Sequence, residues 1–186
     1  MSSGKLLFSL PSAITEDGVD SLIAELETAG FIGAMIEPGV RKFFAGDRFL
    51  QLITFMGCSP FLKLEPDGDS SDDFCSIRIR GPYTEPRFVA GSNTRPPRCP
   101  RCRQRMEGEW QALVERWKAD ADTQYNCPRC HESVPFEVLE WRQNAGAGRL
   151  FVEVTQIFPG EAVPVQALMD LLGRHGSPWN YFYIQE

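Results

Sequence analysis

The tetrapeptide Cys-Pro-Arg-Cys occurs twice in this chain, at residues 99–102 and at residues 127–130. Two cysteines three positions apart can bind one metal ion from a tight turn. The proline after the first cysteine removes one backbone N–H and restricts φ, so each turn is preorganised. Two such pairs supply the four thiolates that close a tetrahedron around zinc. The sequence therefore predicts one structural zinc ion per chain, held by Cys99, Cys102, Cys127 and Cys130.

The stretch from Cys99 to Cys130 resembles a zinc ribbon, with knuckles of the kind also found in rubredoxin-like sites. The resemblance covers this stretch and its flanking strands, and it implies a structural metal. Two features differ from the usual pattern. The knuckles are separated by 24 residues, and Arg103 and His131 stand where such turns often carry a left-handed glycine. Iron on the same sulfurs and two redox-active Cys-x-x-Cys pairs are the alternatives, but nothing nearby calls for electron transfer.

The composition is that of an ordinary globular protein. Of 186 residues, 42% are hydrophobic and 24% are charged, which suffices for one core and a small second module. Glu16 and Asp17 follow closely after the short apolar run in residues 1–10, and no small-residue cleavage site is present, so we expect no signal peptide. No apolar run approaches the roughly 20 residues of a membrane helix. With cysteine spacing typical of metal sites, this predicts a cytoplasmic protein without membrane contact.

Charge is unevenly distributed along the chain. Residues 94–131 carry a formal charge of +3, and the remainder carries −9, which makes the remainder a poor surface for phosphates. Ribbon modules that bind nucleic acid use arginines near a knuckle, and Trp110 and Trp117 could stack on bases. We favour a solvated arginine rim and inward-packed tryptophans, because the tryptophans share a helix face with Leu113 and Val114. The arginines concerned are Arg95, Arg98, Arg101, Arg103 and Arg105.

The two ends of the chain show the same strand, helix and strand pattern. The apolar positions of the two helices coincide at a constant offset of 146 residues. Two such units favour an α+β fold of the ferredoxin-like kind, with both helices on one face of an antiparallel sheet. The first unit comprises a strand at residues 6–10, a helix at residues 15–29 capped by Thr15, and a strand at residues 31–37; the second comprises a strand at residues 150–158, a helix at residues 165–175 and a strand at residues 179–185.

This pattern predicts two parts: an α+β domain of residues 1–94 with 132–186, and an inserted zinc-ribbon module of residues 95–131. Apolar spacing, alternation and turn residues predict the connecting elements. These are a helix at residues 49–56, a hairpin of strands at residues 61–65 and 74–80 around an acidic loop, a linker at residues 86–97, a helix at residues 110–117, and a second hairpin of strands at residues 134–141 and 150–158 joined by a turn at residues 144–148.

Two further cysteines and two histidines are the remaining candidates for chemistry. Cys58 follows a helix end, whose dipole disfavours a thiolate, and it has no basic neighbour, so we interpret it as a packed thiol. Cys75 alternates with apolar residues on a strand and is expected in the core. His131 adjoins a complete set of four thiolates, and His175 lies in the last turn of a helix. The sequence therefore predicts no catalytic residue.

Three functional hypotheses remain. The first is a zinc-binding, protein-binding or regulatory module without catalysis, whose partner is another protein. The second is a nucleic-acid-associated regulator that uses the arginine-rich first knuckle. The third is an enzyme with a pocket near Cys58.

Overall fold

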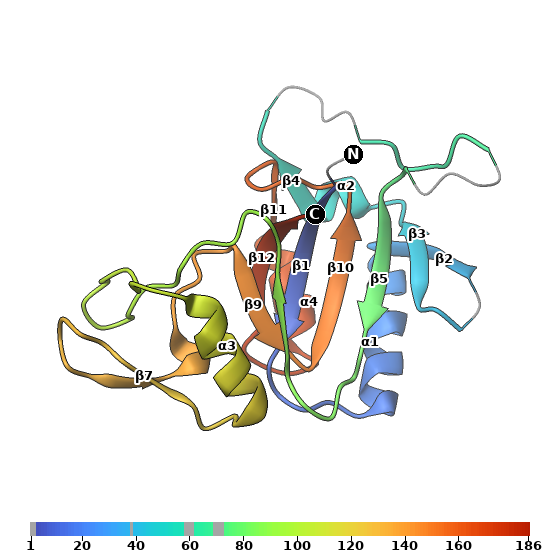
Figure 1. Cartoon of the computed structure of the whole chain (residues 1–186). Coiled ribbons are helices and arrows are strands. Elements are labelled where there is room, and N and C mark those ends of the chain that lie inside the picture. Colours follow the sequence, from blue (N-terminus) through green and yellow to red (C-terminus); the bar gives the residue numbers. More distant parts are fainter. Residues whose placement is uncertain (1–2, 38, 58–61, 69–72) are drawn as a thin grey trace.

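The computed structural model describes residues 3–37, 39–57, 62–68 and 73–186. Its centre is a six-stranded sheet in which every neighbouring pair is antiparallel (Figure 1). The strands follow the order β12 (Asn180–Gln185), β1 (Gly4–Leu10), β10 (Leu150–Thr155), β5 (Ser76–Arg80), β3 (Lys42–Ala45) and β2 (Ile32–Glu37).

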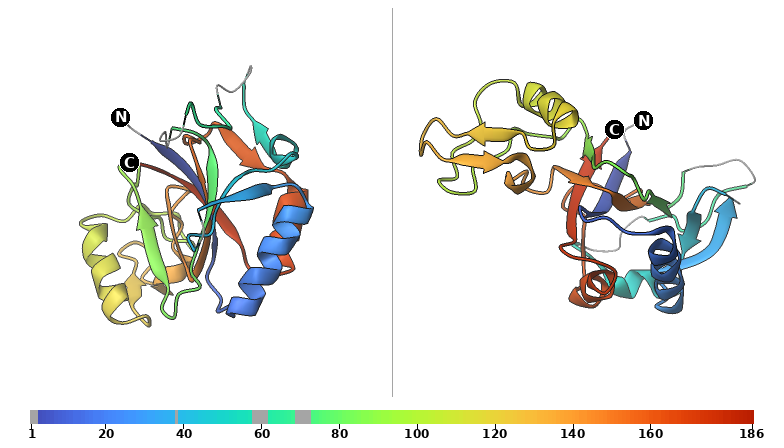
Figure 2. Two further views of the ribbon diagram at one scale, coloured as in Figure 1. Left: turned by 90° about the vertical axis from the view of Figure 1, so that its right-hand side faces the viewer. Right: turned by 90° about the horizontal axis from the view of Figure 1, so that it is seen from below.

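Helices α1 (Glu16–Thr28) and α4 (Gln166–Gly173) cover one face of this sheet (Figure 2). The α1 helix begins as expected, because the Thr15 hydroxyl accepts a hydrogen bond from the Gly18 N–H at 3.1 Å. Its buried residues Val19, Leu22 and Leu26 pack into the main hydrophobic core with alternate residues of the central strands. The opposite face of the sheet carries the small apolar cluster of Leu7, Phe151, Phe182 and Ile184.

The first strands of the two predicted units lie side by side. β1 pairs with β10 over residues 5–10 and with β12 over residues 4–9. A four-stranded ferredoxin-like sheet would place β2 directly beside β10, but here β5 and β3 lie between them. The described residues thus form a mixed α and β fold with a large antiparallel sheet and four α-helices.

The predicted helix at residues 49–56 is wrong beyond its first turn. The chain forms a short helix α2 (Phe49–Leu52) and then a strand β4 (Ile53–Phe55), which pairs with β11 (Ala162–Pro164). Main-chain pairing with a distant segment overrides the local apolar spacing. Met56, expected on the apolar face of the helix, is 65% exposed.

The first predicted hairpin is also wrong. Residues 62–64 form no strand, and only the Cys75 N–H reaches back to the Lys63 carbonyl, at 2.7 Å. β5 instead pairs with β10 and β3, because its buried Ile77 and Ile79 belong to the main core. Part of the acidic loop lies outside the described residues.

The first part of the predicted linker and most of the glycine-rich turn instead form a pair of strands, whereas residues 91–97 remain outside any strand. β6 (Arg87–Ala90) and β9 (Ala145–Gly148) are antiparallel partners in front of the sheet (Figure 1). The small residues of β9 allow this close approach, since a Cβ atom at Gly146 would overlap the ring of Phe182. The strand expected at residues 134–141 is shortened to β8 (Ser133–Pro135), followed by a 3₁₀ turn at Phe136–Val138.

Candidate metal centre

The two Cys-Pro-Arg-Cys knuckles have the same backbone hydrogen bonds. In the first, the Cys99 N–H donates to the Gln104 carbonyl and the Arg103 N–H donates to the Cys99 carbonyl, both at 2.9 Å. In the second, the Cys127 N–H donates to the Glu132 carbonyl and the His131 N–H donates to the Cys127 carbonyl, again both at 2.9 Å. Identical tetrapeptides therefore fold into identical turns.

Arg103 and His131 adopt the left-handed conformation usual for glycine at this position, with φ values of 59° and 60°. A left-handed backbone costs a residue with a side chain about 1 kcal/mol or more. Both side chains are exposed, so neither meets a steric obstacle. The departure from glycine thus leaves the knuckle geometry unchanged.

The four cysteine sulfur atoms lie within 4.8 Å of one another. Cys99 Sγ and Cys130 Sγ are 3.7 Å apart, and Cys102 Sγ and Cys127 Sγ are 3.6 Å apart. A tetrahedron with metal–sulfur bonds of about 2.3 Å has edges of about 3.8 Å. Disulfide sulfurs lie about 2.05 Å apart, so these distances describe free thiols. The cluster is a candidate metal site, as the sequence predicted.

The electrostatics of the cluster favour a bound cation. Hydrogen bonds from the backbone N–H groups of Cys130 and Arg129 lower the pKa of the Cys127 thiol to about 7. The backbone N–H of Glu132 lowers the pKa of Cys130, but burial and the three neighbouring sulfurs outweigh it and raise that pKa to about 12. Four thiolates this close repel one another, and a divalent cation removes that repulsion.

A second hydrophobic core surrounds the knuckles. Helix α3 (Trp110–Ala119) contributes Leu113, Val114 and Trp117, and the hairpin of β7 (Gln124–Asn126) with β8 contributes Tyr125 and Val134. This core extends beyond residues 95–131, because Phe88, Phe136 and Trp141 also belong to it. In Figure 2, α3 and the hairpin lie on the other side of the sheet from α1 and α4.

The tryptophans of α3 pack inward, as we interpreted them. Trp117 is 2% exposed, stacks on Phe136 at 4.6 Å between ring centroids, and donates from Nε1 to the Glu137 carboxylate at 2.8 Å. Half-buried Trp110 packs edge-on against Trp141 at 5.5 Å.

Of the other predicted residues, only His131 adjoins the metal cluster within the described part of the chain, through its backbone in the second knuckle. His131 is exposed, and His175 lies beside Glu25, with 3.3 Å between its Nε2 and the carboxylate. Cys75 is buried in the main core, where desolvation raises its pKa to about 12, so its assignment to the core is confirmed. Cys58 lies outside the described residues.

The five predicted arginines divide into two groups. Arg95, Arg98 and Arg105 line a small cavity together with Arg142, which the sequence reasoning missed because it is far along the chain. Arg101 and Arg103 are exposed on the knuckle and do not line this cavity.

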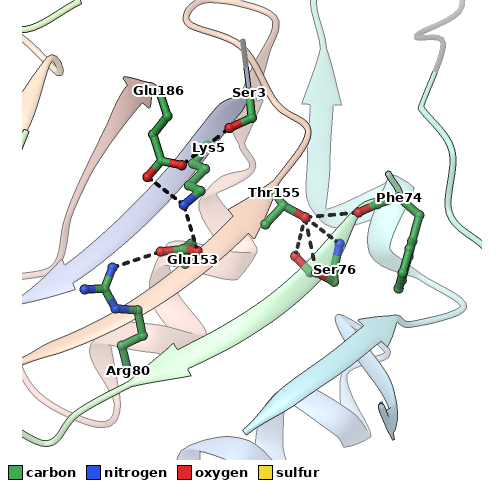
Figure 3. A network of polar contacts seen from close by, with 8 residues as sticks. All are labelled: Ser3, Lys5, Phe74, Ser76, Arg80, Glu153, Thr155 and Glu186. Atoms are coloured by element: carbon green, nitrogen blue, oxygen red, sulfur yellow. Dashed lines mark hydrogen bonds and ion pairs between the residues drawn. The ribbon is translucent and has the colours of Figure 1, made fainter. Parts of the chain in front are cut away.

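The sequence reasoning also missed a polar network on the sheet face opposite the helices (Figure 3). The Glu153 carboxylate, on the 4% exposed residue at the centre of β10, lies 3.0 Å from Arg80 Nη1 and 3.5 Å from Lys5 Nζ. Lys5 also contacts Glu186 at 2.8 Å. The one signal was a glutamate inside an otherwise apolar strand. This network links β1, β10 and β5. Its charged members are Lys5, Arg80, Glu153 and Glu186, and none of these is a histidine or a cysteine.

Comparison with protein-family models, with curated proteins and with solved structures finds no match for this chain. Within the described residues, no helix is long and apolar enough to cross a lipid bilayer.

Proposed function

We propose that Cys99, Cys102, Cys127 and Cys130 hold one zinc ion and that this ion is structural. The observation that carries the proposal is the clustering of four sulfurs within 4.8 Å of one another, with two of the six separations, 3.6 and 3.7 Å, close to the edge of a tetrathiolate tetrahedron. Four thiolates leave no open position for water or substrate, so the ion contributes to folding and does not act as a Lewis acid.

Elemental analysis of protein purified without added metal tests the proposal. We expect one zinc per chain, removed by a strong chelator together with the folded structure of α3 and the β7–β8 hairpin. Iron in place of zinc would support the rubredoxin-like alternative. Two disulfides and no metal would contradict both.

We further propose that the main sheet is a ferredoxin-like sheet with two additional strands, β5 and β3. The alternation of strands and helices in both units supports this topology. The division into residues 1–94 with 132–186 and an inserted module of residues 95–131 remains our proposal, with an inserted core that draws on flanking residues from Phe88 to Ala147.

The protein, in this proposal, acts in the cytoplasm by binding another protein. A cavity of about 580 Å³ supports it, because it lies between the segment of residues 136–147 and the sheet and is lined by aromatic residues, among them Trp141, Trp179 and Tyr181. Val138, at its edge, is 49% exposed. Aromatic pockets beside exposed apolar side chains are typical of protein-binding surfaces.

A matched pair of variants tests this surface. Val138→Glu should abolish recovery of the partner from nuclease-treated native extract, whereas Leu50→Glu, an equally exposed apolar position on α2, should not. Equal recovery by both variants would exclude the cavity edge as the binding surface.

Nucleic-acid binding is the second candidate, because Arg101 and Arg103 are exposed on the first knuckle. It predicts an affinity for single-stranded RNA that falls steeply with salt and that decreases in Arg101→Gln and Arg103→Gln. Salt-independent or undetectable binding would exclude it.

A further inference from the structure

A cavity of about 210 Å³ lies where the segment before the first knuckle meets the turn at residues 141–144. Its charged lining is entirely basic, and its remaining lining residues are Pro96, Trp141 and Asn144. Within the part of the chain that the structure describes, no carboxylate forms an ion pair with any of the lining arginines. These arginines are Arg95, Arg98, Arg105 and Arg142.

Backbone hydrogen bonds hold the walls of this cavity in place. Arg98 N–H donates to the Glu140 carbonyl and Glu140 N–H donates to the Arg98 carbonyl, both at 3.0 Å, and Arg98 also forms a β-bridge with Arg105. The buried Thr94 hydroxyl donates to the Asn144 carbonyl at 2.7 Å, which fixes the residue before Arg95 to the opposite wall. The backbone segments that carry the arginines are therefore fixed relative to one another.

The turn that supplies Arg142 is held in an uncommon conformation. Arg142 and Gln143 both have left-handed backbones, with φ values of 51° and 60°, and the Asn144 N–H donates to the Trp141 carbonyl at 3.1 Å. The Tyr183 N–H of β12 donates to the Gln143 carbonyl at 2.9 Å and ties the turn to the sheet. Two consecutive left-handed residues make a tight turn, and these hydrogen bonds hold it in place.

We propose that this cavity binds the phosphate group of a small phosphate monoester. Four arginines line this small volume, three of them exposed and Arg98 half-buried, so the cavity is positively charged and a dianion neutralises that charge. A phosphate monoester carries nearly two negative charges and three acceptor oxygens, whereas a carboxylate has one charge and is satisfied by one bidentate arginine. Guanidinium forks match phosphate oxygens in geometry.

A small molecule fits these observations better than a nucleic acid. A volume of 210 Å³ equals about seven water molecules at roughly 30 Å³ each, which accommodates one phosphate and part of the group that it is attached to. A long polyanion would also meet the acidic remainder of the chain, whose formal charge is −9. Trp141 in the wall offers an apolar surface to the organic part of the ligand.

Calorimetric titration of the metal-loaded full chain tests the proposal with four probes: inorganic phosphate, uridine 5′-monophosphate, uridine, and an eight-nucleotide RNA without terminal phosphate. We expect inorganic phosphate, uridine 5′-monophosphate or both to bind. We expect no binding of uridine. Phosphate alone would identify the free ion as the ligand, and tighter binding of the nucleotide would identify a phosphorylated small molecule. Arg98→Gln and Arg142→Gln should each weaken binding about tenfold or more.

Arg116→Gln is the matched control, because Arg116 is an exposed arginine of the same module that does not line the cavity. It should bind as the unmodified protein does. Equal affinities in Arg98→Gln, Arg142→Gln and Arg116→Gln, or no binding of any phosphate probe, would overturn the proposal. Tighter binding of the RNA than of the monophosphate, with a loss in Arg101→Gln, would also overturn it in favour of a nucleic-acid surface.

Discussion

Replacing Cys127 with serine tests whether the metal folds the inserted module. Cys127 is 1% exposed and its Sγ lies 3.6 Å from that of Cys102. A structural zinc site contributes about 10–16 kcal/mol at pH 7, so the loss of one ligand in four removes about 2.5–4 kcal/mol. The module core has eleven buried residues, and a core of this size supplies only about 3–5 kcal/mol. The loss is about as large as what the core supplies, so the variant module should retain little stability at 25 °C and should open readily.

The main sheet should survive this change. Its core has 25 buried residues, most of them from the six central strands and three helices, and none of them is a metal-site cysteine. Hydrogen exchange followed by mass spectrometry can separate the two parts. We expect protection to be lost in α3 and in the β7–β8 hairpin and to be retained in β1 and β12.

Cys75→Ser is the matched control, because it makes the same chemical change in the other core. Cys75 is fully buried in the main sheet, and a serine hydroxyl there costs about 1–3 kcal/mol if it finds no partner. This variant should keep its metal and should weaken protection in the sheet. Uniform loss of protection across β1, β12 and α3 in Cys127→Ser would refute the reasoning, since sheet and module would then unfold as one unit.

Three further changes have expected outcomes. Burial raises the pKa of the Cys75 thiol to about 12 in the folded protein, whereas the unfolded thiol ionises near pH 9. The free energy of unfolding should therefore fall above about pH 9, by up to about 1.4 kcal/mol per pH unit more than in Cys75→Ala. The same pH dependence of this free energy in both proteins, measured by urea denaturation, would contradict this. Glu153→Gln should lower the free energy of unfolding at pH 7 by about 1–2 kcal/mol, a value reduced for the partial exposure of its two cationic partners. Glu186→Gln, at a 54% exposed carboxylate, should change this free energy by less than about 0.5 kcal/mol. Equal effects of the two changes in urea denaturation would count against a buried network. Gly146→Ala should destabilise the protein by about 1–3 kcal/mol because its methyl group overlaps the Phe182 ring of β12. Gly173→Ala, with open space around it in α4, should stabilise the protein by up to about 1 kcal/mol. If Gly146→Ala leaves the thermal melting temperature unchanged, β9 can shift to make room for the methyl group.

The parts of this protein that the sequence predicted well are local. A cysteine pair three residues apart forms its turn from its own backbone, so the candidate metal ligands could be read directly. The same holds for α1, whose cap and apolar face lie within one segment, and for β5 (Ser76–Arg80), which begins directly after Cys75. These features depend on residues a few positions apart, which is the range that periodicity and capping rules describe.

Tertiary structure decided the rest, because strand partners and cavity walls come from distant segments. Residues 144–148 have the composition of a turn, yet most of them form β9, since β6 offers a paired edge and the ring of Phe182 needs the space beside Gly146. Residues 53–55 continue a helical pattern but extend to pair with β11. Arg142 joins Arg98 only because the backbone of Glu140 bridges to that of Arg98, a contact between segments 42 positions apart that no local pattern encodes.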